Sequence, residues 1–366
     1  MRLAQRADAI VERCDVTAYK IPTESPESDG TLEWDSTTLV LVELGCEQIT
    51  GIGYTYADAA TGKLIEEKLV PIVRGADSFS IGSLWTKMVA SIRNLGRPGI
   101  ASMAIAAIDN ALWDLKARLL GLPLFQLLGA TRDRVPIYGS GGFTSYPVER
   151  LQRQLAGWVG DGVPRVKMKV GRDSKSDYDR VLAARFAIGE AAELFVDANG
   201  AYAVKEALEF ARRFAGLGVS WFEEPVYHRD LAGIGRVRDA APPAMEISAG
   251  EYGYDSYDFA RIIEAVDVLQ ADVTRCEGIT GFLAVDALCE ARGVSLSTHC
   301  APAVTAHAAA AAKQFRHLEY FHDHVRIERM LFDGIPPVRN GAIVLSESGP
   351  GNGLEFKRRD AEPYKL

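Results

Sequence analysis

Short apolar segments alternate with longer amphipathic segments from about residue 135 onward, and this alternation limits the fold more than any other feature of the chain. The segment ELFVDANG, for example, precedes VKEALEFARRFAGLG, in which Ala207, Phe210 and Phe214 fall on one face of a helix. Strand–helix units of this length imply parallel strands joined by crossover helices. At least seven units in succession favour a closed barrel over an open sheet. We therefore expect residues 131–335 to form an α/β barrel.

Residues 1–130 show a different pattern, in which strand-like segments come before helices. The strand-like segments are rich in β-branched residues and cover 14–22, 36–45 and 47–56. Turns or bulges are expected at Gly45, Gly51 and Gly53. These features predict an α+β unit ahead of the barrel.

The remaining parts of the chain complete this outline. Residues 22–35 are polar, acidic and rich in turn formers, which predicts a loop with its carboxylates in solvent. Helices are expected over 79–95 and 99–120, and Gly121 and Pro123 would end the second. The tail after residue 335 is typical of turns and a short hairpin.

The composition excludes several classes of partner. The chain has 41 basic and 49 acidic residues, a formal charge of −8 and no basic block, which argues against nucleic acid. No apolar run approaches the roughly 20 residues that span a bilayer, so no membrane association is expected. The five cysteines are scattered and odd in number. They predict reduced thiols and a cytoplasmic location.

Polar residues follow the barrel segments at a regular spacing. Counted from Lys169, successive polar positions are 28, 26, 28, 21, 27 and 20 residues apart, which is one strand–helix unit at each step. The positions are Asp197, Glu223, Glu251, Asp272, His299 and Glu319. Because catalytic groups of such barrels gather at the carboxyl ends of the strands, we expect these side chains to converge.

Lys167 and Lys169 alternate with apolar residues in VKMKV, so they share one face of a strand. On the motif alone, a solvated edge strand is as good an interpretation as a functional site. The regular spacing of the other polar residues favours the site.

Three carboxylates on successive strands, Asp197, Glu223 and Glu251, would repel one another without a cation. A hard divalent ion resolves this repulsion, and oxygen ligands suit Mg²⁺. Asn199 lies two residues past Asp197 on the same face and would add a contact. Glu224 should point away from the site if its strand continues.

The lysines and the histidine are expected on opposite sides of this metal. Asp272 would fix the tautomer of His299 and raise its basicity. A lysine crowded by Mg²⁺ and by a second lysine should have a lowered pKa. Two acid/base groups facing each other across a bound substrate suit removal of the proton α to a carboxylate. Glu319 would hydrogen-bond a substrate carboxylate oxygen, provided that it is protonated.

These residues resemble the enolase superfamily and, within it, the mandelate racemase subgroup. The motifs that carry the resemblance stand in the family's order over nearly the whole chain and are VKMKV, VDANG, WFEEP, SAGE, QADVTRC, STHCAP and HLEYF. The resemblance implies a modified (β/α)₇β TIM barrel and an N-terminal α+β capping domain, which the tail 336–366 would complete. It also implies Mg²⁺, a homo-oligomer, Lys169 as one base, the His299–Asp272 dyad as the other, and Lys167 as an electrostatic aid.

Members of this subgroup dehydrate acid sugars, racemise 2-hydroxy acids, or open and close sugar lactones. We expect a small-molecule sugar acid as substrate and a dehydratase giving a 2-keto-3-deoxy product. Racemase or epimerase, lactone cycloisomerase and a catalytically silent binding barrel stay open as alternatives. By position, the expected pocket residues are Tyr54, Tyr56, Phe143, Thr144 and Ser145.

Other polar residues receive structural interpretations. Cys300 is expected to pack and Glu277 to face water. His307 should be structural. A surface or supporting role is expected for His317, His322 and His324.

Overall fold

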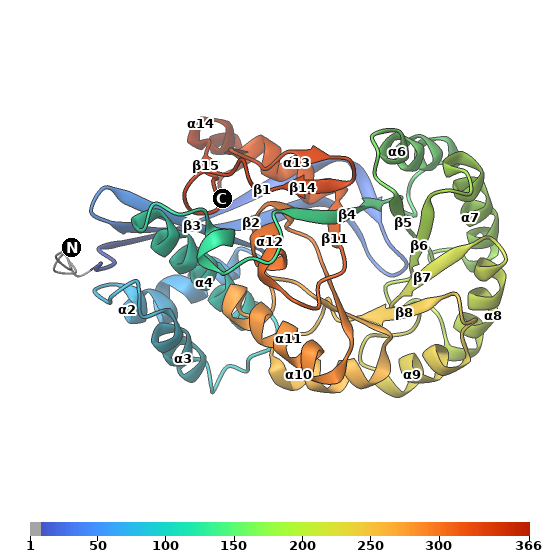
Figure 1. The fold of residues 1–366 in the computed structure, drawn as a ribbon, viewed down its shortest axis with the longest axis horizontal. Helices are drawn as coiled ribbons and strands as arrows, with labels where there is room; N and C mark the ends of the chain where they lie inside the picture. The colour runs from blue at the N-terminus through green and yellow to red at the C-terminus, as the bar shows by residue number, and fades with distance from the viewer. Residues whose placement is uncertain (1–8) are drawn as a thin grey trace.

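The computed structural model describes residues 9–366, and within them the parallel strands form a closed barrel (Figure 1). Its strands are β4 (Arg134–Gly141), β5 (Arg165–Lys169), β6 (Glu193–Asp197), β7 (Val219–Glu223), β8 (Glu246–Ala249), β9 (Val268–Ala271), β10 (Ser295–Thr298) and β11 (Leu318–Phe321). They follow one another in chain order around the sheet, and β11 pairs with β4. The barrel closes between β10 and β11, where Arg316 N donates to Leu296 O at 2.8 Å.

Helices connect the barrel strands and cover the outside of the barrel (Figure 1). They are α6 (Val148–Gly160), α7 (Ser174–Ile188), α8 (Val204–Ala215), α9 (Leu231–Ala240), α10 (Ser256–Ile262) with η2 (Ile263–Ala265), α11 (Gly278–Arg292) and α12 (Pro302–Ala311). The expected (β/α)₇β order is therefore confirmed.

Strand β5 shows why the VKMKV pattern is not an edge strand. It is hydrogen-bonded to β4 on one side and to β6 on the other. Val166 and Met168 pack in the core beneath the helices. Their neighbours Lys167 and Lys169 face the barrel interior because side chains alternate along a strand.

The capping unit is a three-stranded antiparallel sheet with helices. Its strands are β1 (Arg13–Ser28), β2 (Glu33–Cys46) and β3 (Ile49–Tyr56), in the order β1-β2-β3. Its helical segments are α1 (Ala60–Leu64), η1 (Ile65–Leu69), α2 (Val70–Val73), α3 (Ile81–Ser91), α4 (Ile100–Leu119) and α5 (Leu124–Leu127). Residues 1–8 of the expected unit lie outside the described residues.

Both faces of the capping sheet are buried, which explains the unbroken apolar run in β2. Val40 and Val42 belong to the core that the sheet shares with α4. Leu39 and Leu41 pack on the other face, in a cluster that contains Val304 of α12. The sheet is thus fixed between its own helices and the barrel.

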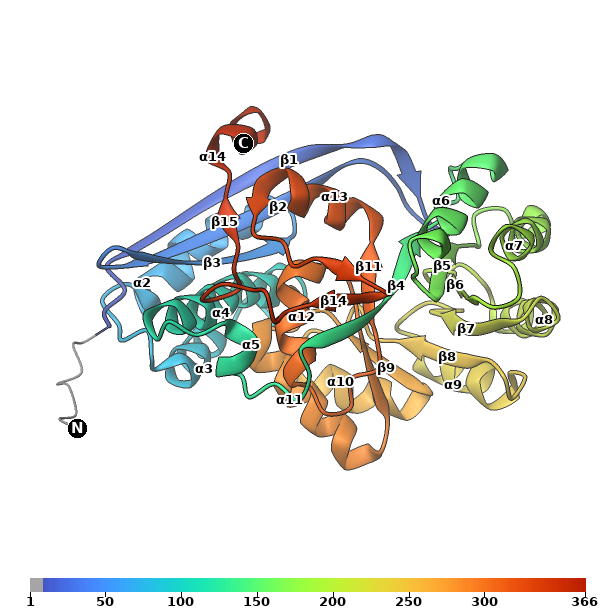
Figure 2. The same ribbon diagram turned by 45° about the horizontal axis from the view of Figure 1, so that its top comes forward.

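The expected loop over residues 22–35 is wrong. Strand β1 continues to Ser28 and β2 begins at Glu33, with a register irregularity between Pro22 and Glu27. The turn between them is held by Asp29, whose Oδ1 accepts hydrogen bonds from Thr31 N at 2.6 Å and Leu32 N at 2.7 Å. The long β1–β2 hairpin crosses from the cap to the barrel near β4 (Figure 2).

The three glycines expected at turns or bulges lie inside paired strands instead. Strands β2 and β3 pair in a continuous register from Leu39 to Cys46. At Gly53, a Cβ atom would lie 2.2 Å from Ala107 O of α4, and at Gly51, 2.5 Å from Ala111 O. These two glycines therefore permit close packing of α4 on β3.

The tail returns across the molecule toward the cap. Its elements are α13 (His322–Leu331), β12 (Phe332–Asp333), β13 (Val338–Arg339), β14 (Ala342–Val344), β15 (Glu355–Phe356), α14 (Arg358–Ala361) and η3 (Glu362–Tyr364). The expected hairpin is β13–β14, and β14 also pairs with barrel strand β4. At the chain end, Leu366 N donates to Ala18 O of β1 at 3.0 Å.

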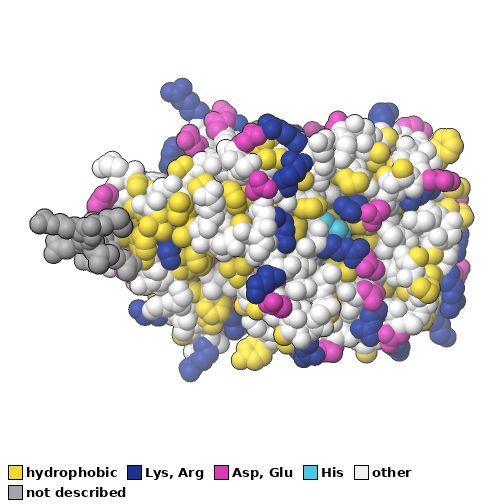
Figure 3. Space-filling view, viewed as in Figure 1, with side chains coloured by type: hydrophobic (Ala, Val, Ile, Leu, Met, Phe, Trp, Pro, Cys, Tyr) yellow, Lys and Arg dark blue, Asp and Glu magenta, His cyan; other side chains and the backbone are white. Residues whose placement is uncertain are grey.

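Acidic and basic side chains are interspersed over the face shown in Figure 3. Among the helices of residues 9–366, none combines the length and the apolar character needed to cross a bilayer.

Candidate active site

Three buried carboxylates meet at the carboxyl ends of neighbouring barrel strands. Asp197 ends β6, Glu223 ends β7, and Glu251 follows β8. One oxygen of each lies within 4.8 Å of the others. The first two are oriented by the chain itself, because Asp197 Oδ1 accepts from Asn199 N at 2.9 Å and Glu223 Oε2 accepts from Trp221 Nε1 at 3.1 Å.

Crowding by the neighbouring carboxylates opposes ionisation of Glu223. Burial and the neighbouring Asp197 raise the pKa of Glu223 to about 8. Glu251 Oε2 is buried and has no hydrogen-bond partner among the described residues. A buried, unpaired carboxylate oxygen is costly, so this donor set suits a divalent cation bound by oxygen.

The two lysines contact the carboxylate cluster directly. Lys169 Nζ lies 2.5 Å from Asp197 Oδ2, and Lys167 Nζ lies 2.6 Å from Glu223 Oε1. Lys167 Nζ is also 2.8 Å from Glu319 Oε1. Both ammonium groups therefore face the cluster from the β5 side of the barrel.

The pKa values of both lysines are raised, whereas the sequence predicted a lowered value. Burial on its own would lower them, but Glu223 raises the pKa of Lys167 and Asp197 raises that of Lys169. The expectation assumed a cation bound to the carboxylates. With the carboxylates turned to the ammonium groups, the attraction outweighs desolvation.

Asp272 and His299 form a buried pair on the other side of the cluster. His299 Nδ1 lies 2.7 Å from Asp272 Oδ2. Thr274 holds the second oxygen of Asp272, to which its backbone N donates at 2.6 Å and its hydroxyl at 2.7 Å. The pair leaves His299 Nε2 pointing toward Glu251 Oε2, 3.3 Å away.

Charge around the histidine favours its protonated form. Burial would lower the pKa of His299, but Glu251 and Glu319 raise it above the usual value. Burial would likewise raise the pKa of Asp272, but His299 lowers it. Both shifts favour the ion pair of a protonated His299 with an ionised Asp272.

Arg275 is a site residue that the sequence analysis did not identify. Its Nε lies 3.5 Å from Asp272 Oδ2, and its Nη1 donates to Glu251 O at 3.0 Å. It therefore links the dyad to the loop that carries Glu251. The only available signal was its position three residues after Asp272, in a loop whose conformation spacing does not fix.

Glu319 is ionised, whereas the expected donor role requires a proton. Burial would raise its pKa, but Lys167 and His299 hold the pKa of Glu319 well below its usual range. Its Oε1 also accepts a hydrogen bond from Ser140 Oγ of β4 at 2.6 Å. Glu319 therefore acts as a counter-charge between the lysine and the histidine.

Glu224 points toward the cluster, because the strand does not continue past Glu223. Its φ of 36° turns the chain at the end of β7. Burial, and then Glu251 and Asp197, raise the pKa of Glu224 well above its usual value. Neither of its carboxylate oxygens has a hydrogen-bond partner in the described part of the chain.

Asn199 stands at a second sharp turn after β6, with a φ of 45°. Its side-chain Oδ1 is buried without a hydrogen-bond partner within residues 9–366. Its backbone oxygen accepts from Thr31 Oγ1 at 3.4 Å, so the hairpin tip lies over this turn.

The five expected pocket residues have different environments. Tyr54 OH donates to Glu328 Oε1 at 2.6 Å, and Tyr56 stacks on His324 with ring centroids 3.4 Å apart. The ring of Phe143 is fully buried against Trp34. Thr144 bonds to the hairpin tip through Ser28 Oγ at 2.6 Å, and Ser145 is exposed. Phe143 and Thr144 therefore anchor the hairpin.

A cavity of about 750 Å³, lined by both polar and apolar side chains, adjoins the cluster through Glu224 and Gly250. Its polar lining was not identified from the sequence and comprises Tyr227, His228, Arg229, Tyr252, Tyr254, Asp258 and Arg261. Five of these residues come from the loops after β7 and β8, and Asp258 and Arg261 come from α10, so strand spacing could not indicate them.

The expectation that Glu277 faces water is wrong. Its carboxylate is buried and accepts hydrogen bonds from Arg97 Nε at 2.7 Å and Nη2 at 2.5 Å. This pair links the cap to the start of α11. His307 is structural as expected, with Nε2 3.1 Å from Asn352 O.

Two protein-family models match the chain and together cover most of it. Residues 15–129 match the mandelate racemase/muconate lactonizing enzyme N-terminal domain, and residues 150–361 match the enolase C-terminal domain-like family.

Individual proteins are similar over nearly the full length. A crystal structure of a mandelate racemase/muconate lactonizing enzyme-like protein from Rubrobacter xylanophilus is 53% identical with a TM-score of 0.96, covering 98% of this chain and 100% of that one. A 3,6-anhydro-alpha-L-galactonate cycloisomerase from Streptomyces coelicolor is 32% identical over 95% of this chain and 98% of its own.

A third similar protein is the L-talarate/galactarate dehydratase from Salmonella typhimurium. It is 32% identical over 97% of this chain and 90% of its own. Its crystal structure liganded with Mg and L-lyxarohydroxamate has a TM-score of 0.89, covering 100% of this chain and 96% of that one at 28% identity. With both domains matched and the barrel-mouth residues in place, the chain belongs to the enolase superfamily and within it to the mandelate racemase/muconate lactonizing enzyme family.

Proposed function

We propose that this protein removes the proton α to the carboxylate of a sugar acid in a Mg²⁺-dependent reaction, and that it is a dehydratase. The observation that carries the proposal is the cluster of Asp197, Glu223 and Glu251 between a lysine pair and a histidine–aspartate dyad. Acid/base groups on both sides of one carboxylate cluster suit reversible proton removal at carbon.

The donor set fits Mg²⁺. Three carboxylate oxygens lie within 4.8 Å of one another, and Glu251 Oε2 is buried without a hydrogen-bond partner in the described residues. Mg²⁺ prefers such oxygen ligands and keeps further positions open. When bound, Mg²⁺ supplies positive charge that stabilises the additional negative charge on the substrate's carboxylate oxygens. The dehydratase of Salmonella typhimurium has been crystallised with Mg.

Lys169 is the proposed base on one side. Its Nζ lies 2.5 Å from Asp197 Oδ2, so it must leave this carboxylate and release one ammonium proton to solvent before it accepts a proton from carbon. Lys167 is fully buried between Glu223 and Glu319 and stays charged. It therefore contributes positive charge near the substrate carboxylate.

His299 is the proposed acid/base group on the other side. Asp272 holds the proton on Nδ1, which leaves Nε2 for the substrate. In dehydration, the protonated Nε2 gives its proton to the departing 3-hydroxyl as the carbon–oxygen bond breaks. The raised pKa of His299 suits this donor role.

The cavity beside Glu224 supports a polyhydroxylated substrate. Tyr252, Tyr254 and His228 offer hydroxyl and imidazole groups to substrate hydroxyls. A lactone cycloisomerase is the second candidate, because the similar protein from Streptomyces coelicolor carries that activity in its name. Cycloisomerisation begins with the same proton removal as dehydration, and the two reactions differ in the oxygen that leaves.

The deciding experiment incubates the protein with Mg²⁺ and aldonic, uronic and aldaric acids and sugar lactones in D₂O. Dehydration gives a 2-keto-3-deoxy product that reacts with semicarbazide. Cycloisomerisation consumes or forms a lactone, and racemisation gives α-deuteration with neither product. Protein treated with EDTA is the control. Absence of exchange and turnover across the panel would contradict the proposal.

We also propose a homo-oligomer in the cytoplasm, with a cap of residues 1–130 and 336–366 on a barrel of residues 131–335. An apolar patch on α7, where Leu182 and Phe186 are exposed one turn apart, supports self-association. The five unpaired cysteines support a reducing compartment. Light scattering after gel filtration would test the oligomer, and a single-chain mass would contradict it.

A further inference from the structure

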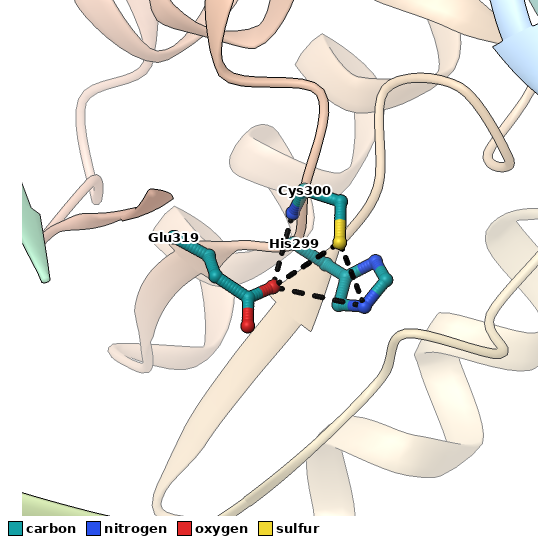
Figure 4. Close-up of side chains that lie close together, drawn as sticks. All are labelled: His299, Cys300 and Glu319. Atoms are coloured by element: carbon teal, nitrogen blue, oxygen red, sulfur yellow. Dashed lines mark hydrogen bonds and ion pairs between the residues drawn. The ribbon is translucent and has the colours of Figure 1, made fainter. Parts of the chain in front are cut away.

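Three different donor atoms meet beside the carboxylate cluster. His299 Nε2 lies 3.3 Å from Cys300 Sγ, and Glu319 Oε2 lies 3.5 Å from that sulfur and 3.7 Å from the same nitrogen (Figure 4). All three side chains are buried, and the set shares no residue with Asp197, Glu223 and Glu251.

The separations match those of a tetrahedral metal site. With Zn–S near about 2.3 Å and Zn–N or Zn–O near about 2.1 Å, tetrahedral angles place the donor atoms about 3.4–3.6 Å apart. The observed separations of 3.3, 3.5 and 3.7 Å differ from these by a few tenths of an ångström. A zinc ion would therefore need little rearrangement of the three side chains.

The backbone after β10 positions the sulfur. Cys300 and Ala301 have φ values of 50° and 44°, so two consecutive residues are left-handed. Non-glycine residues adopt this conformation only at a cost in backbone strain. Cys300 N donates to Glu319 Oε2 at 3.1 Å, which fixes the turn against the carboxylate and brings Sγ to the same side as His299 Nε2.

A fourth donor faces this set. Glu251 Oε2 is 3.3 Å from His299 Nε2, and among the described residues it accepts no hydrogen bond. The residue is 3% exposed. Glu251 also belongs to the carboxylate cluster, so this oxygen favours a cation at this end of the barrel without distinguishing the two sites.

We propose that His299, Cys300 and Glu319 form a second metal site, selective for a borderline-soft divalent ion of the Zn²⁺ type. Sulfur and imidazole ligands select such ions over Mg²⁺, which the oxygen-only cluster suits. On binding, the Sγ–H bond and the Nε2–H bond of protonated His299 break, Sγ–metal and Nε2–metal bonds form, and two protons pass to solvent. No electron is transferred.

The site predicts inhibition by zinc. A metal on His299 Nε2 occupies the lone pair that the proposed acid/base step uses, so turnover should fall even when Mg²⁺ is saturating. This consequence rests on the proposed function, whereas metal binding at the site does not. Burial raises the pKa of the Cys300 thiol, so the thiol carries a proton that binding must release.

Calorimetry with Zn²⁺ and absorbance with Co²⁺, both in saturating Mg²⁺, test the site in the full chain. Wild-type protein should bind one equivalent, release protons and give a sulfur-to-cobalt charge-transfer band. Cys300→Ser should lose both the charge-transfer band and the binding of one metal equivalent. Cys46→Ser, which changes another buried thiol in the cap, should keep both.

The wild-type spectrum decides the proposal even if Cys300→Ser does not fold, because absence of the band overturns it. A band that survives in folded Cys300→Ser overturns it as well.

The two proposals fail separately. An inactive protein that shows the band would contradict the function alone, and an active protein without the band would contradict the zinc site alone.

Discussion

The two sides of the barrel mouth differ in the partners that hold their side chains in place. The lysine side consists of Lys167 and Lys169, and the histidine side consists of Asp272 and His299. The lysine ammonium groups contact the proposed metal ligands themselves, at 2.5 and 2.6 Å. His299 is held by its own aspartate at 2.7 Å and contacts a proposed metal ligand only at 3.3 Å, through Glu251 Oε2. When a cation binds, the lysine side must therefore exchange its closest partners, whereas the histidine side keeps its closest partner, Asp272.

This difference assigns distinct roles to two apparently similar bases. The pKa values of the two lysines depend on whether the carboxylates of Asp197 and Glu223 face the ammonium groups. Orientation of the histidine depends on Asp272, which Thr274 fixes from the other side. Metal binding should consequently affect the lysine side far more than the histidine side.

The largest effect should come from removing one base at a time. Lys169→Met and His299→Asn should each slow α-proton exchange by about 10³-fold, because each removes an acid/base group. Each change should act on one epimer at C2 and spare the other. Loss of the C2 proton signal by NMR in D₂O, measured for both epimers of a turned-over acid, checks this.

Circular dichroism and Mg²⁺ binding provide the control for folding in both variants. If the two changes slow the same epimer, the bases do not face each other across the substrate. Unchanged exchange in His299→Asn would remove that residue from the mechanism.

A smaller effect should separate the metal ligands from the dyad. Glu223→Gln removes a carboxylate of the cluster and should weaken Mg²⁺ binding by about 10–100-fold. Asp272→Asn removes an equally buried carboxylate on the histidine side and should change Mg²⁺ affinity far less. Isothermal titration calorimetry measures both. Equal losses would mean that the dyad is coupled to the cation.

Regular spacing made much of this site predictable from the sequence. Each strand–helix unit returns the chain to the same end of the barrel, so Asp197, Glu223 and Glu251 could be placed together without a structure. The same rule fails one residue later. Glu224 turns inward because β7 ends at Glu223, and a positive φ is not visible in strand periodicity.

Loops and long-range pairing account for the other differences. Arg275 reaches the dyad from a loop, and no periodicity constrains its side chain. The polar stretch between Pro22 and Asp35 was expected to be solvated. Glu24 and Glu33 are exposed as expected, but Asp29 and Glu27 are buried, and Glu27 accepts a hydrogen bond from Trp34 Nε1 at 3.1 Å. Such pairs depend on the β1–β2 register, which composition does not specify.

The smallest effect concerns Glu328, whose hydrogen bonds support the backbone that follows His299. Helix α13 holds the turn after β10, because Ala303 N donates to Glu328 Oε2 at 3.1 Å and Tyr54 OH of the cap donates to Oε1. Burial raises the pKa of Glu328 to about 8. On the lysine side, β5 is held by its barrel neighbours β4 and β6.

Glu328→Gln should therefore change how stability depends on pH. Between its unfolded pKa of about 4.3 and its folded pKa of about 8, native Glu328 keeps a proton that the unfolded chain has lost. The native state then binds more protons, so the free energy of unfolding falls as pH rises, by at most about 1.4 kcal/mol per pH unit from this group. Glu328→Gln should remove that contribution, and urea unfolding at several pH values measures it. Glu209→Gln, on the exposed face of α8, should keep the wild-type slope. Equal slopes in all three proteins would show that native Glu328 does not keep the proton that its burial predicts.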